Sequence, residues 1–279
     1  MAELSLSRRA LTGVLEQVRL VAADIVRCRR ILSTLTGIEC RQKYAGSVLG
    51  TLWYPLYSLL LLGSYCFIYL VVFRMKYKEF STYSYVLFIF SGLVPYLGFS
   101  ESVTSSLNSV RSNLAILRNS VFPIELVPVK HVLAAFVPLL CSLAVLLAMI
   151  APTSHAGSHL LYLPIPLVCL FLVSLTVAWI VSGIAVVLPD VAQLVNVGLL
   201  LFMFISPIGY TVDMVPPRAR PLVYFNPMTY LIEPFRYALL GVRNTPLWTD
   251  AIILGVAAML ACAAAALFNQ MTPVFFDYE

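Results

Sequence analysis

The chain has 279 residues, of which 61% are hydrophobic and 11% are charged, and its mean hydropathy is +0.92. Soluble domains are about 45–50% apolar and about 25% charged, so this composition excludes an ordinary soluble enzyme, a secreted disulfide scaffold and a disordered chain. The net charge of +5 comes mostly from the N-terminal segment and indicates membrane orientation rather than nucleic-acid binding. The sequence therefore predicts an all-α polytopic membrane protein. The six cysteines lie in apolar runs or in the basic N-terminal segment, so we expect free thiols.

The first 43 residues form a basic segment that precedes the first apolar run. Leu, Val and Ile alternate with Arg at helix-like intervals from residue 11 to residue 43, a pattern typical of an amphipathic helix in a membrane interface. A soluble helix packed on a partner is the alternative interpretation. No cleavable signal peptide is expected, because no continuous apolar core ends in a small-residue site. We assign residues 1–43 to a cytoplasmic N-terminus that carries an interface helix.

Long stretches with few or no Asp, Glu, Lys or Arg residues predict six membrane spans, because a spanning helix needs about 20 mainly apolar residues. The expected spans are residues 44–73, 82–110, 128–151, 162–188, 191–212 and 249–272, within a transmembrane domain of residues 44–276. Six spans put both termini on one side of the membrane. That side carries eleven Lys and Arg residues and the other side seven, so the positive-inside rule predicts cytoplasmic termini.

Two connecting segments differ from ordinary loops. Residues 111–125 are short, contain several apolar positions and include a proline near their end. They predict either a connecting turn or a short helix that docks a cytoplasmic partner. Residues 214–247 are rich in proline and aromatic residues, too apolar for a solvated loop and too interrupted for a span. They predict re-entrant helices that line an exit path, because irregular backbone at membrane depth must be covered by protein or by a water-filled cavity.

Several kinds of chemistry are missing from the sequence. There is no Gly-Lys dipeptide, so we expect no Walker A loop and no nucleotide in this chain, and the zinc-protease and serine-hydrolase motifs are also absent. His155 and His159 lie four residues apart without a nearby third ligand, which favours a polar hairpin over a metal site. Glu101 is the one acid deep inside a predicted span, and buried ionisable residues are functional candidates by default. A coupling-ion carboxylate is the less favoured interpretation of Glu101.

Aromatic residues crowd the first two predicted spans. Interfacial belts explain those near the span ends but not those at depth, such as Tyr57, Tyr65 and Tyr96. Tyrosine combines an apolar ring with a polar tip, so a column of such rings offers stacking faces and hydroxyl groups to a sugar chain. Packing between helices is the alternative for each single residue. The candidates for a glycan channel are Trp53, Tyr54, Tyr57, Tyr65, Tyr85, Tyr96 and Phe99.

Five stretches give the chain a family resemblance. They are residues 43–55 (KYAGSVLGTLWYP), 90–96 (FSGLVPY), 113–128 (NLAILRNSVFPIELVP), 206–210 (SPIGY) and 226–236 (NPMTYLIEPFR). Together and in this order, they resemble the ABC-2 type membrane subunits of bacterial polysaccharide-export ABC transporters, which export O-antigen, capsule or teichoic acid. The chain departs from the family at Pro189, where an Arg usually precedes the acid, and at Ala45-Gly46, which replace a basic pair.

The resemblance implies a permease subunit that forms the transmembrane channel of an ATP-driven exporter of lipid-linked polysaccharide, O-antigen or capsule first, across the inner membrane. Such permeases form a homodimer with the pore between the two copies. Each copy binds a separate cytoplasmic ATPase subunit, which carries ATP and Mg. The substrate would be an undecaprenyl-pyrophosphate-linked glycan. This chain would then be a transport subunit and no enzyme, with no cofactor or metal of its own.

The resemblance also assigns roles to residues. Residues 111–125 would be the coupling helix, with contacts to the ATPase from Arg111, Leu114, Leu117, Arg118, Phe122, Pro123 and Glu125. The lipid pyrophosphate would enter near Arg41 and Lys43, which are the candidates to replace the missing basic pair. The outer helices would form a gate that includes Asn226, Pro227, Tyr230, Glu233 and Arg236. Glu233 and Arg236 are three residues apart and would pair on one helix face.

Other functions remain open from the sequence. The chain could be the permease of an ABC-2 drug or small-molecule exporter, or of a teichoic-acid exporter. A membrane enzyme acting on lipid-linked sugars would need clustered carboxylates or histidines, whereas the acids here are scattered. An ion-coupled transporter would need inverted repeats with broken helices at the midplane, and we find no internal repeat.

Overall fold

A computed structural model describes residues 14–43, 45–72, 74, 81–113, 122–153, 155, 157–243 and 245–275. These residues form helices and connecting turns, with no strand among them. The helices are α2 (Val14–Arg27), α3 (Arg29–Lys43), η1 (Gly50–Leu52), α4 (Trp53–Cys66), η2 (Phe67–Val72), α5 (Thr82–Leu107), η3 (Arg111–Asn113), α7 (Leu126–Ile150), η4 (Ser158–Tyr162), α8 (Pro164–Val187), α9 (Val191–Ile205), η5 (Val212–Met214), α10 (Arg220–Tyr224), α11 (Pro227–Leu240) and α12 (Trp248–Phe275). The predicted all-α fold is therefore confirmed for the described part of the chain.

Five helical stretches in the described residues are long and apolar enough to cross a membrane. They are Gly50–Val72, Thr82–Leu107, Leu126–Ile150, Ser158–Val187 and Trp248–Thr272. The predicted fifth span contains α9, which has 15 residues. At about 1.5 Å per residue α9 is about 22 Å long, which is shorter than the roughly 30 Å hydrocarbon core of a bilayer.

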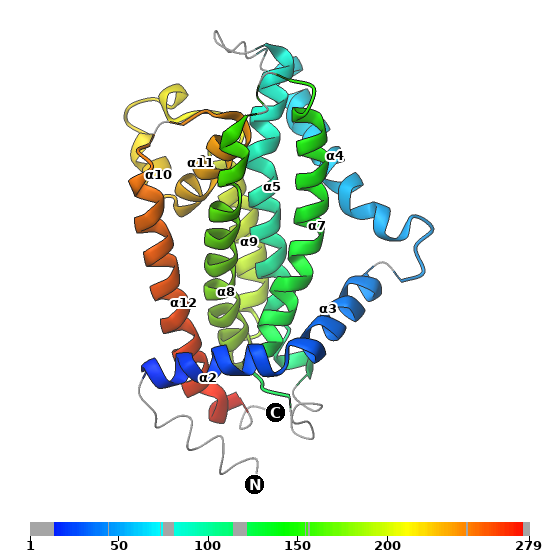
Figure 1. Cartoon of the computed structure of the whole chain (residues 1–279), viewed down its shortest axis with the longest axis vertical. Helices are drawn as coiled ribbons and strands as arrows, with labels where there is room; N and C mark the ends of the chain where they lie inside the picture. The colour runs from blue at the N-terminus through cyan, green and yellow to red at the C-terminus, as the bar shows by residue number, and fades with distance from the viewer. Residues whose placement is uncertain are drawn as a thin grey trace.

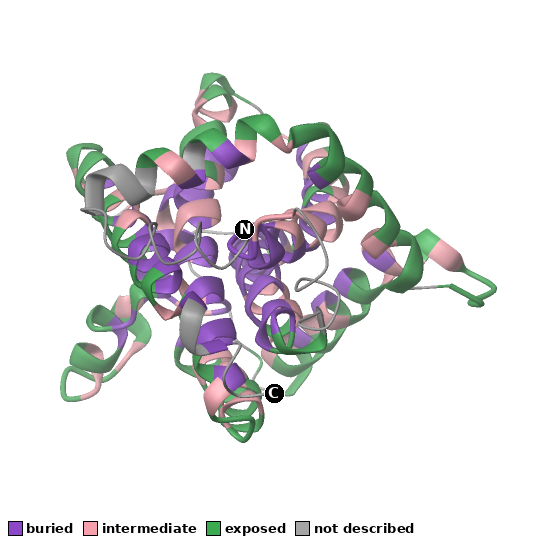
Figure 2. Ribbon diagram, turned by 90° about the horizontal axis from the view of Figure 1, so that it is seen from below, coloured by how far each residue is buried: buried purple, intermediate pink, exposed green. Residues whose placement is uncertain are grey.

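Helix α5 lies at the centre of the bundle, and α4 lies at its edge (Figure 1). In the most apolar window of each span, 78% of the residues of α5 are buried, against 17% for the span that begins with Gly50. Close packing between α5 and α7 depends on Gly98, since a Cβ atom there would lie 1.9 Å from Cδ1 of Leu139. Small residues at such contacts bring helix backbones together in membranes, where lipid removes most of the hydrophobic drive for association. Figure 2 shows the buried residues gathered in the middle of the bundle.

The predicted amphipathic segment forms two helices, α2 and α3, that lie across one end of the bundle (Figure 1). Their buried residues Val21 and Leu32 belong to a cluster that includes Phe268 and Phe275 near the end of α12. Helix α2 also packs directly against α12. The first described helix and the end of the last one therefore lie at the same end of the bundle.

All six cysteines are free, which confirms the prediction. The two histidines of the hairpin do not meet at a common site. Nε2 of His155 lies 3.2 Å from the hydroxyl of Ser84 in α5, and Nδ1 of His159 lies 3.0 Å from the carbonyl oxygen of Ala238 in α11. The hairpin histidines thus tie the loop before α8 to two different helices.

Candidate functional site

The turn that follows α9 is held by side chains from several helices. The guanidinium of Arg236 in α11 donates hydrogen bonds to the carbonyl oxygens of Pro207, at 2.5 Å, and Ile208, at 2.7 Å. The hydroxyl of Tyr85 in α5 donates to the carbonyl oxygen of Gly209 at 2.6 Å. Three successive carbonyl groups are therefore satisfied by α5 and α11. We call residues 206–210 with these partners the outer hub.

Arg236 is the most buried charge in the outer hub, with 5% of its surface exposed. Its guanidinium carbon lies 3.7 Å from the centre of the Phe88 ring, in a cation–π contact. A buried charge is costly unless it is well solvated by protein groups. The two carbonyl groups and the ring supply that solvation, so the position of Arg236 is tightly defined.

Asn226 connects the outer hub to the start of α11. Its side-chain oxygen accepts a hydrogen bond from the backbone N–H of Met228 at 2.8 Å, and its amide donates to the hydroxyl of Ser206 at 3.1 Å. Asn at the cap and Pro227 at the first helical position form a favourable helix start, because the cap satisfies a free N–H and proline has none. The start of α11 is thus fixed to the end of α9.

The structure brings together only part of the predicted gate. Asn226 and Arg236 meet the 206–210 turn, whereas Tyr230 is 38% exposed and Glu233 is half-buried. Among the ion pairs of the described residues, none joins Glu233 to Arg236. Arg236 turns instead toward backbone oxygens and α5, so the expected pairing on one helix face is not the arrangement found.

Sequence reasoning did not identify Tyr69 as a neighbour of Gly209 in the 206–210 turn. A Cβ atom on Gly209 would lie 2.5 Å from Cε2 of Tyr69, so the turn and the π-helix η2 are in direct contact. Tyr69 also stacks on Tyr65, with ring centres 5.9 Å apart. The π-helical turn was not predictable from residue spacing, but the SPIGY motif marked the turn that it contacts.

Most of the predicted channel aromatics lie inside one copy of the chain. Five of the seven are buried: Tyr54, Tyr65, Tyr85, Tyr96 and Phe99. The hydroxyl of Tyr54 donates to the carbonyl of Cys40 at 2.9 Å, and that of Tyr96 donates to the carbonyl of Leu199. Trp53 is half-buried, and Tyr57 is 56% exposed. Packing accounts for the buried rings, and a role in a channel stays a prediction.

The predicted lipid-pyrophosphate residues lie at the other end of the bundle from the outer hub. Arg41 is exposed, and Nζ of Lys43 lies 2.5 Å from a carboxylate oxygen of Glu101 in α5. The side chains of this pair are 38% and 35% exposed. The acid embedded in the second span therefore has a basic partner at the end of α3.

A second polar contact joins α3 to α7. Glu39 lies 2.8 Å from Nζ of Lys130 and 3.5 Å from Nδ1 of His131. Burial raises the pKa of Glu39, but the hydrogen bond from Lys130 and the nearby charges outweigh it and hold the pKa below its usual range. Helix α3 is thus connected to both α5 and α7 by carboxylates.

The predicted coupling segment is described only at its ends. Leu114, Leu117 and Arg118 lie outside the described residues. Arg111 is exposed in η3, and Phe122 and Pro123 are half-buried. Glu125 is buried at 3% exposure, and its carbonyl oxygen accepts a hydrogen bond from Nε1 of Trp179 at 3.0 Å. The end of the segment is therefore anchored to α8.

Comparison with known proteins adds a family to this geometry. The ABC-2 type transporter family matches residues 32–240. An "O-antigen export system permease protein RfbA" of Klebsiella pneumoniae is 28% identical over 244 residues, which cover 86% of this chain and 92% of the relative. A protein of the same name from Myxococcus xanthus is 25% identical over 263 residues, or 93% and 99% of the two chains.

A further relative, "Inner membrane transport permease YadH" of Escherichia coli strain K12, is 32% identical over 62 residues, which cover 21% of this chain and 24% of the relative. That match is local, whereas the family match includes most of α3, the first four of the five candidate spans, α9 and the outer hub. The residues of the 206–210 turn and of its partners Tyr85, Asn226 and Arg236 all fall within it. This chain belongs to the ABC-2 type transporter family.

Proposed function

We propose that this chain is the permease subunit of an ATP-driven exporter that moves a lipid-linked polysaccharide, of the O-antigen or capsule type, across the inner membrane. The supporting observation is family membership together with relatives that are named O-antigen export permeases and align over nearly their whole length. ATP and Mg²⁺ would be held by a separate cytoplasmic ATPase, because the sequence has no Walker A motif. The chain itself is then a channel rather than an enzyme.

The proposal includes six crossings with both termini in the cytoplasm. The packing of α2 against α12 supports an even number of crossings, because it requires the start and the end of the chain on one side. Helix α9 and the turn after it would complete the fifth crossing. The buried side chains of α11, among them Ile232, Phe235 and Leu239, lie against the spans and support a re-entrant position for this helix.

A second copy of the chain is proposed to complete the channel. No residue of α9 is buried, and Leu194, Leu201 and Phe204 are 70%, 59% and 64% exposed. Helix α4 presents Tyr57 and Leu60 in the same way. These apolar faces support a homodimer in which α4 and α9 approach their counterparts. Tyr57 is then the predicted channel aromatic best placed to meet an undecaprenyl-linked glycan.

ATP-driven closure of the ATPase pair would act on residues 111–125, which connect α5 directly to α7. Helix α3 contacts both of these spans through Glu101 and Glu39, so it would move with them. A polymer longer than the membrane is thick cannot fit a closed cavity. We therefore propose a continuous channel with repeated ATP-driven steps rather than a single alternating-access swing. The basic residues Arg41 and Lys43 would receive the lipid pyrophosphate.

The decisive experiment reconstitutes the chain with its partner ATPase. The complex is purified in membranes, and ATPase activity is measured with and without lipid-linked glycan for wild type, Arg118→Glu and Phe122→Ala. We expect glycan-stimulated activity that collapses in both variants, while Arg218→Glu, an exposed arginine between α9 and α10, behaves as wild type. Two results together would reject the proposal. No ATPase would co-purify with the chain, and cells with Arg118→Glu or Phe122→Ala would export as much glycan as wild-type cells.

A further inference from the structure

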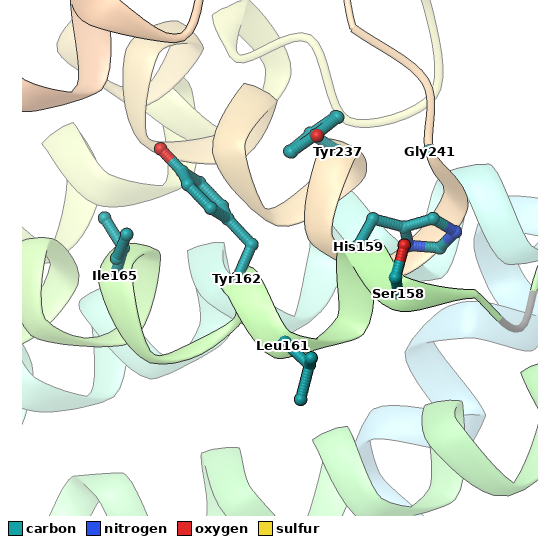
Figure 3. A pocket seen from close by; sticks show the side chains of 7 residues that line it. All are labelled: Ser158, His159, Leu161, Tyr162, Ile165, Tyr237 and Gly241. Atoms are coloured by element: carbon teal, nitrogen blue, oxygen red, sulfur yellow. The ribbon is translucent and has the colours of Figure 1, made fainter.

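A pocket of about 450 Å³ lies between η4 and the C-terminal end of α11, at the opposite end of the bundle from α2 (Figures 1 and 3). Its lining includes Ser158, His159, Tyr162 and Tyr237. Small-molecule sites typically occupy about 300–1,000 Å³ and combine aromatic walls with a few polar groups. None of the predicted channel, gate or lipid-pyrophosphate residues lines this pocket, so it is a separate feature of the molecule.

The aromatic walls of the pocket are fixed by a buried ion pair. The hydroxyl of Tyr162 donates to Oδ2 of Asp250 at 2.6 Å, and Arg243 donates to both oxygens of the same carboxylate, at 2.8 and 2.6 Å. The ring of Tyr237 stands edge-on to that of Tyr162, with centres 5.3 Å apart, and the guanidinium of Arg243 lies 5.4 Å from the Tyr237 ring centre. Both rings are therefore held in place before any ligand binds.

His159 can offer the pocket a hydrogen-bond acceptor. Its Nδ1 lies 3.0 Å from the carbonyl oxygen of Ala238, and because a carbonyl group only accepts, Nδ1 carries the hydrogen. In the neutral ring this leaves Nε2 as a hydrogen-bond acceptor. Glycines surround Nε2, since a Cβ atom would lie 2.9 Å away at Gly157 and 3.4 Å away at Gly241. Gly241 also ends α11 with φ +70°, a left-handed conformation that favours glycine.

The uncommitted polar groups define the kind of ligand. Within the described residues, the hydroxyls of Ser158 and Tyr237 and Nε2 of His159 have no hydrogen bond of their own, and all three residues line the pocket. The charges nearby, on Arg243 and Asp250, satisfy each other. A phosphate or carboxylate ligand would need a pocket with a net positive charge, and an apolar ligand would leave the polar groups of the lining without hydrogen bonds. A neutral ring with one apolar face and several hydroxyl groups matches the lining.

We propose that this pocket binds one neutral sugar ring of the glycan at the outer end of the exporter, stacked on Tyr237 and hydrogen-bonded to His159 and Ser158. The inference rests on the proposed function for the source of the sugar, and on the pocket itself for the ligand chemistry. A site of this kind would hold the emerging chain weakly and hinder its return.

Saturation-transfer NMR on the full chain in lipid nanodiscs tests the proposal. The probes are methyl α-D-mannopyranoside, methyl β-D-galactopyranoside and methyl N-acetyl-β-D-glucosaminide, with glycerol as an acyclic control. We expect transfer to the ring C–H protons of at least one glycoside, with a Kd on the order of 1 mM, and none to glycerol. Tyr237→Ala should abolish the transfer, and His159→Ala should weaken it several-fold. Tyr224→Ala, which removes a 52% exposed tyrosine outside the pocket, should have no effect.

Gly157→Ala provides a second variant in case Tyr237→Ala does not fold. Residue 157 has an extended backbone, with φ −151°, so alanine is unstrained there and acts by crowding Nε2 of His159. Equal transfer in wild type, Tyr237→Ala and Gly157→Ala would overturn the proposal, and so would the absence of transfer to any glycoside. Glycan-stimulated ATPase activity of the wild-type complex is measured in parallel. If the complex is active but no sugar binds, only the proposed sugar site is refuted. If the complex shows no glycan-stimulated activity, the proposed function itself is refuted.

Discussion

The two ends of the bundle use charged residues in different ways. At the end that carries the outer hub, Arg243 and Asp250 form an ion pair with side chains only 8% and 2% exposed, and Arg236 is buried as well. At the end that carries α2 and α3, Lys43 and Glu101 are 38% and 35% exposed. Breaking a buried pair leaves an unpaired charge and costs much, whereas exposed pairs contribute little. The end that carries the outer hub is therefore held by buried charges, whereas the ion pair at the end that carries α2 and α3 is open to solvent.

Removing one member of the buried outer pair gives the largest expected effect. Asp250→Ala leaves Arg243 buried without its carboxylate and frees the hydroxyl of Tyr162, so we expect a loss of about 3–5 kcal/mol in the free energy of unfolding. Thermal unfolding of the purified chain in detergent measures the loss. Asp213→Ala removes an exposed aspartate at the same end and serves as the control. A change no larger than that of the control would mean that the outer pair does not fix this end.

The outer hub gives the next largest effect. Arg236→Met leaves the carbonyl oxygens of Pro207 and Ile208 without their donor, and we expect a loss of about 2–4 kcal/mol in unfolding free energy. Arg236→Lys should recover part of it, because an ammonium group keeps the charge but lacks the planar fork. Arg218→Met, at an exposed position, is the matched control in the same unfolding assay. If lysine restored full stability, charge alone rather than the two-carbonyl geometry would hold the turn.

A smaller effect is expected where the outer hub meets η2. Gly209→Ala places a methyl group 2.5 Å from the Tyr69 ring, which must move, and overpacking of this kind costs about 1–3 kcal/mol. Gly198→Ala in α9 meets no atom within 4 Å and provides the control. The free energy of unfolding should fall in Gly209→Ala and stay the same or rise in Gly198→Ala, with a difference of about 1–3 kcal/mol between the two variants. Two equal values would show that the turn and η2 are not tightly packed.

The inner pair should give the smallest effect on stability. Lys43→Gln removes a half-exposed ion pair, so we expect a change below about 1 kcal/mol. The Lys43→Gln substitution should instead lower the stimulation of the partner ATPase by lipid-linked glycan. The double variant Lys43→Glu with Glu101→Lys should restore the ion pair between the two positions. It should not restore phosphate binding, because residue 43 would then be negatively charged. A stability loss as large as that of Asp250→Ala would contradict the comparison between the two ends.

The spans were predictable from the sequence because membrane insertion depends on local hydropathy. Apolar runs with at most one charged residue correspond to helices such as α5 and α7 within a few residues of their observed bounds. Helix α9 is shorter than its apolar run because Pro207 follows and the chain turns at residues 206–210. A hydropathy window does not register that turn. Periodicity likewise predicted the amphipathic segment, but not that it packs on α12.

The partners of polar and aromatic residues could be predicted much less well. Spacing on one helix suggested Glu233 as the partner of Arg236, but the guanidinium reaches backbone oxygens of a turn that is distant in sequence. Aromatic content predicted a channel, whereas the partners of Tyr85 and Tyr96 are the carbonyl oxygens of Gly209 and Leu199, which are distant in sequence. Such choices depend on which helices become neighbours, and a single sequence does not contain that information in its local pattern. The motifs at 206–210 and 226–236 marked two segments that meet in the outer hub and left their contacts open.

The packing of α2 against α12 has a consequence for biosynthesis. Helix α2 leaves the ribosome well before α12, but it packs on α12, and its buried Val21 belongs to the same apolar cluster as Phe268 of that helix. Until α12 is inserted, the apolar face of α2 must rest on the membrane surface, which its amphipathic character permits. Docking of α2 is thus a late step of assembly, because it can occur only after synthesis has reached α12.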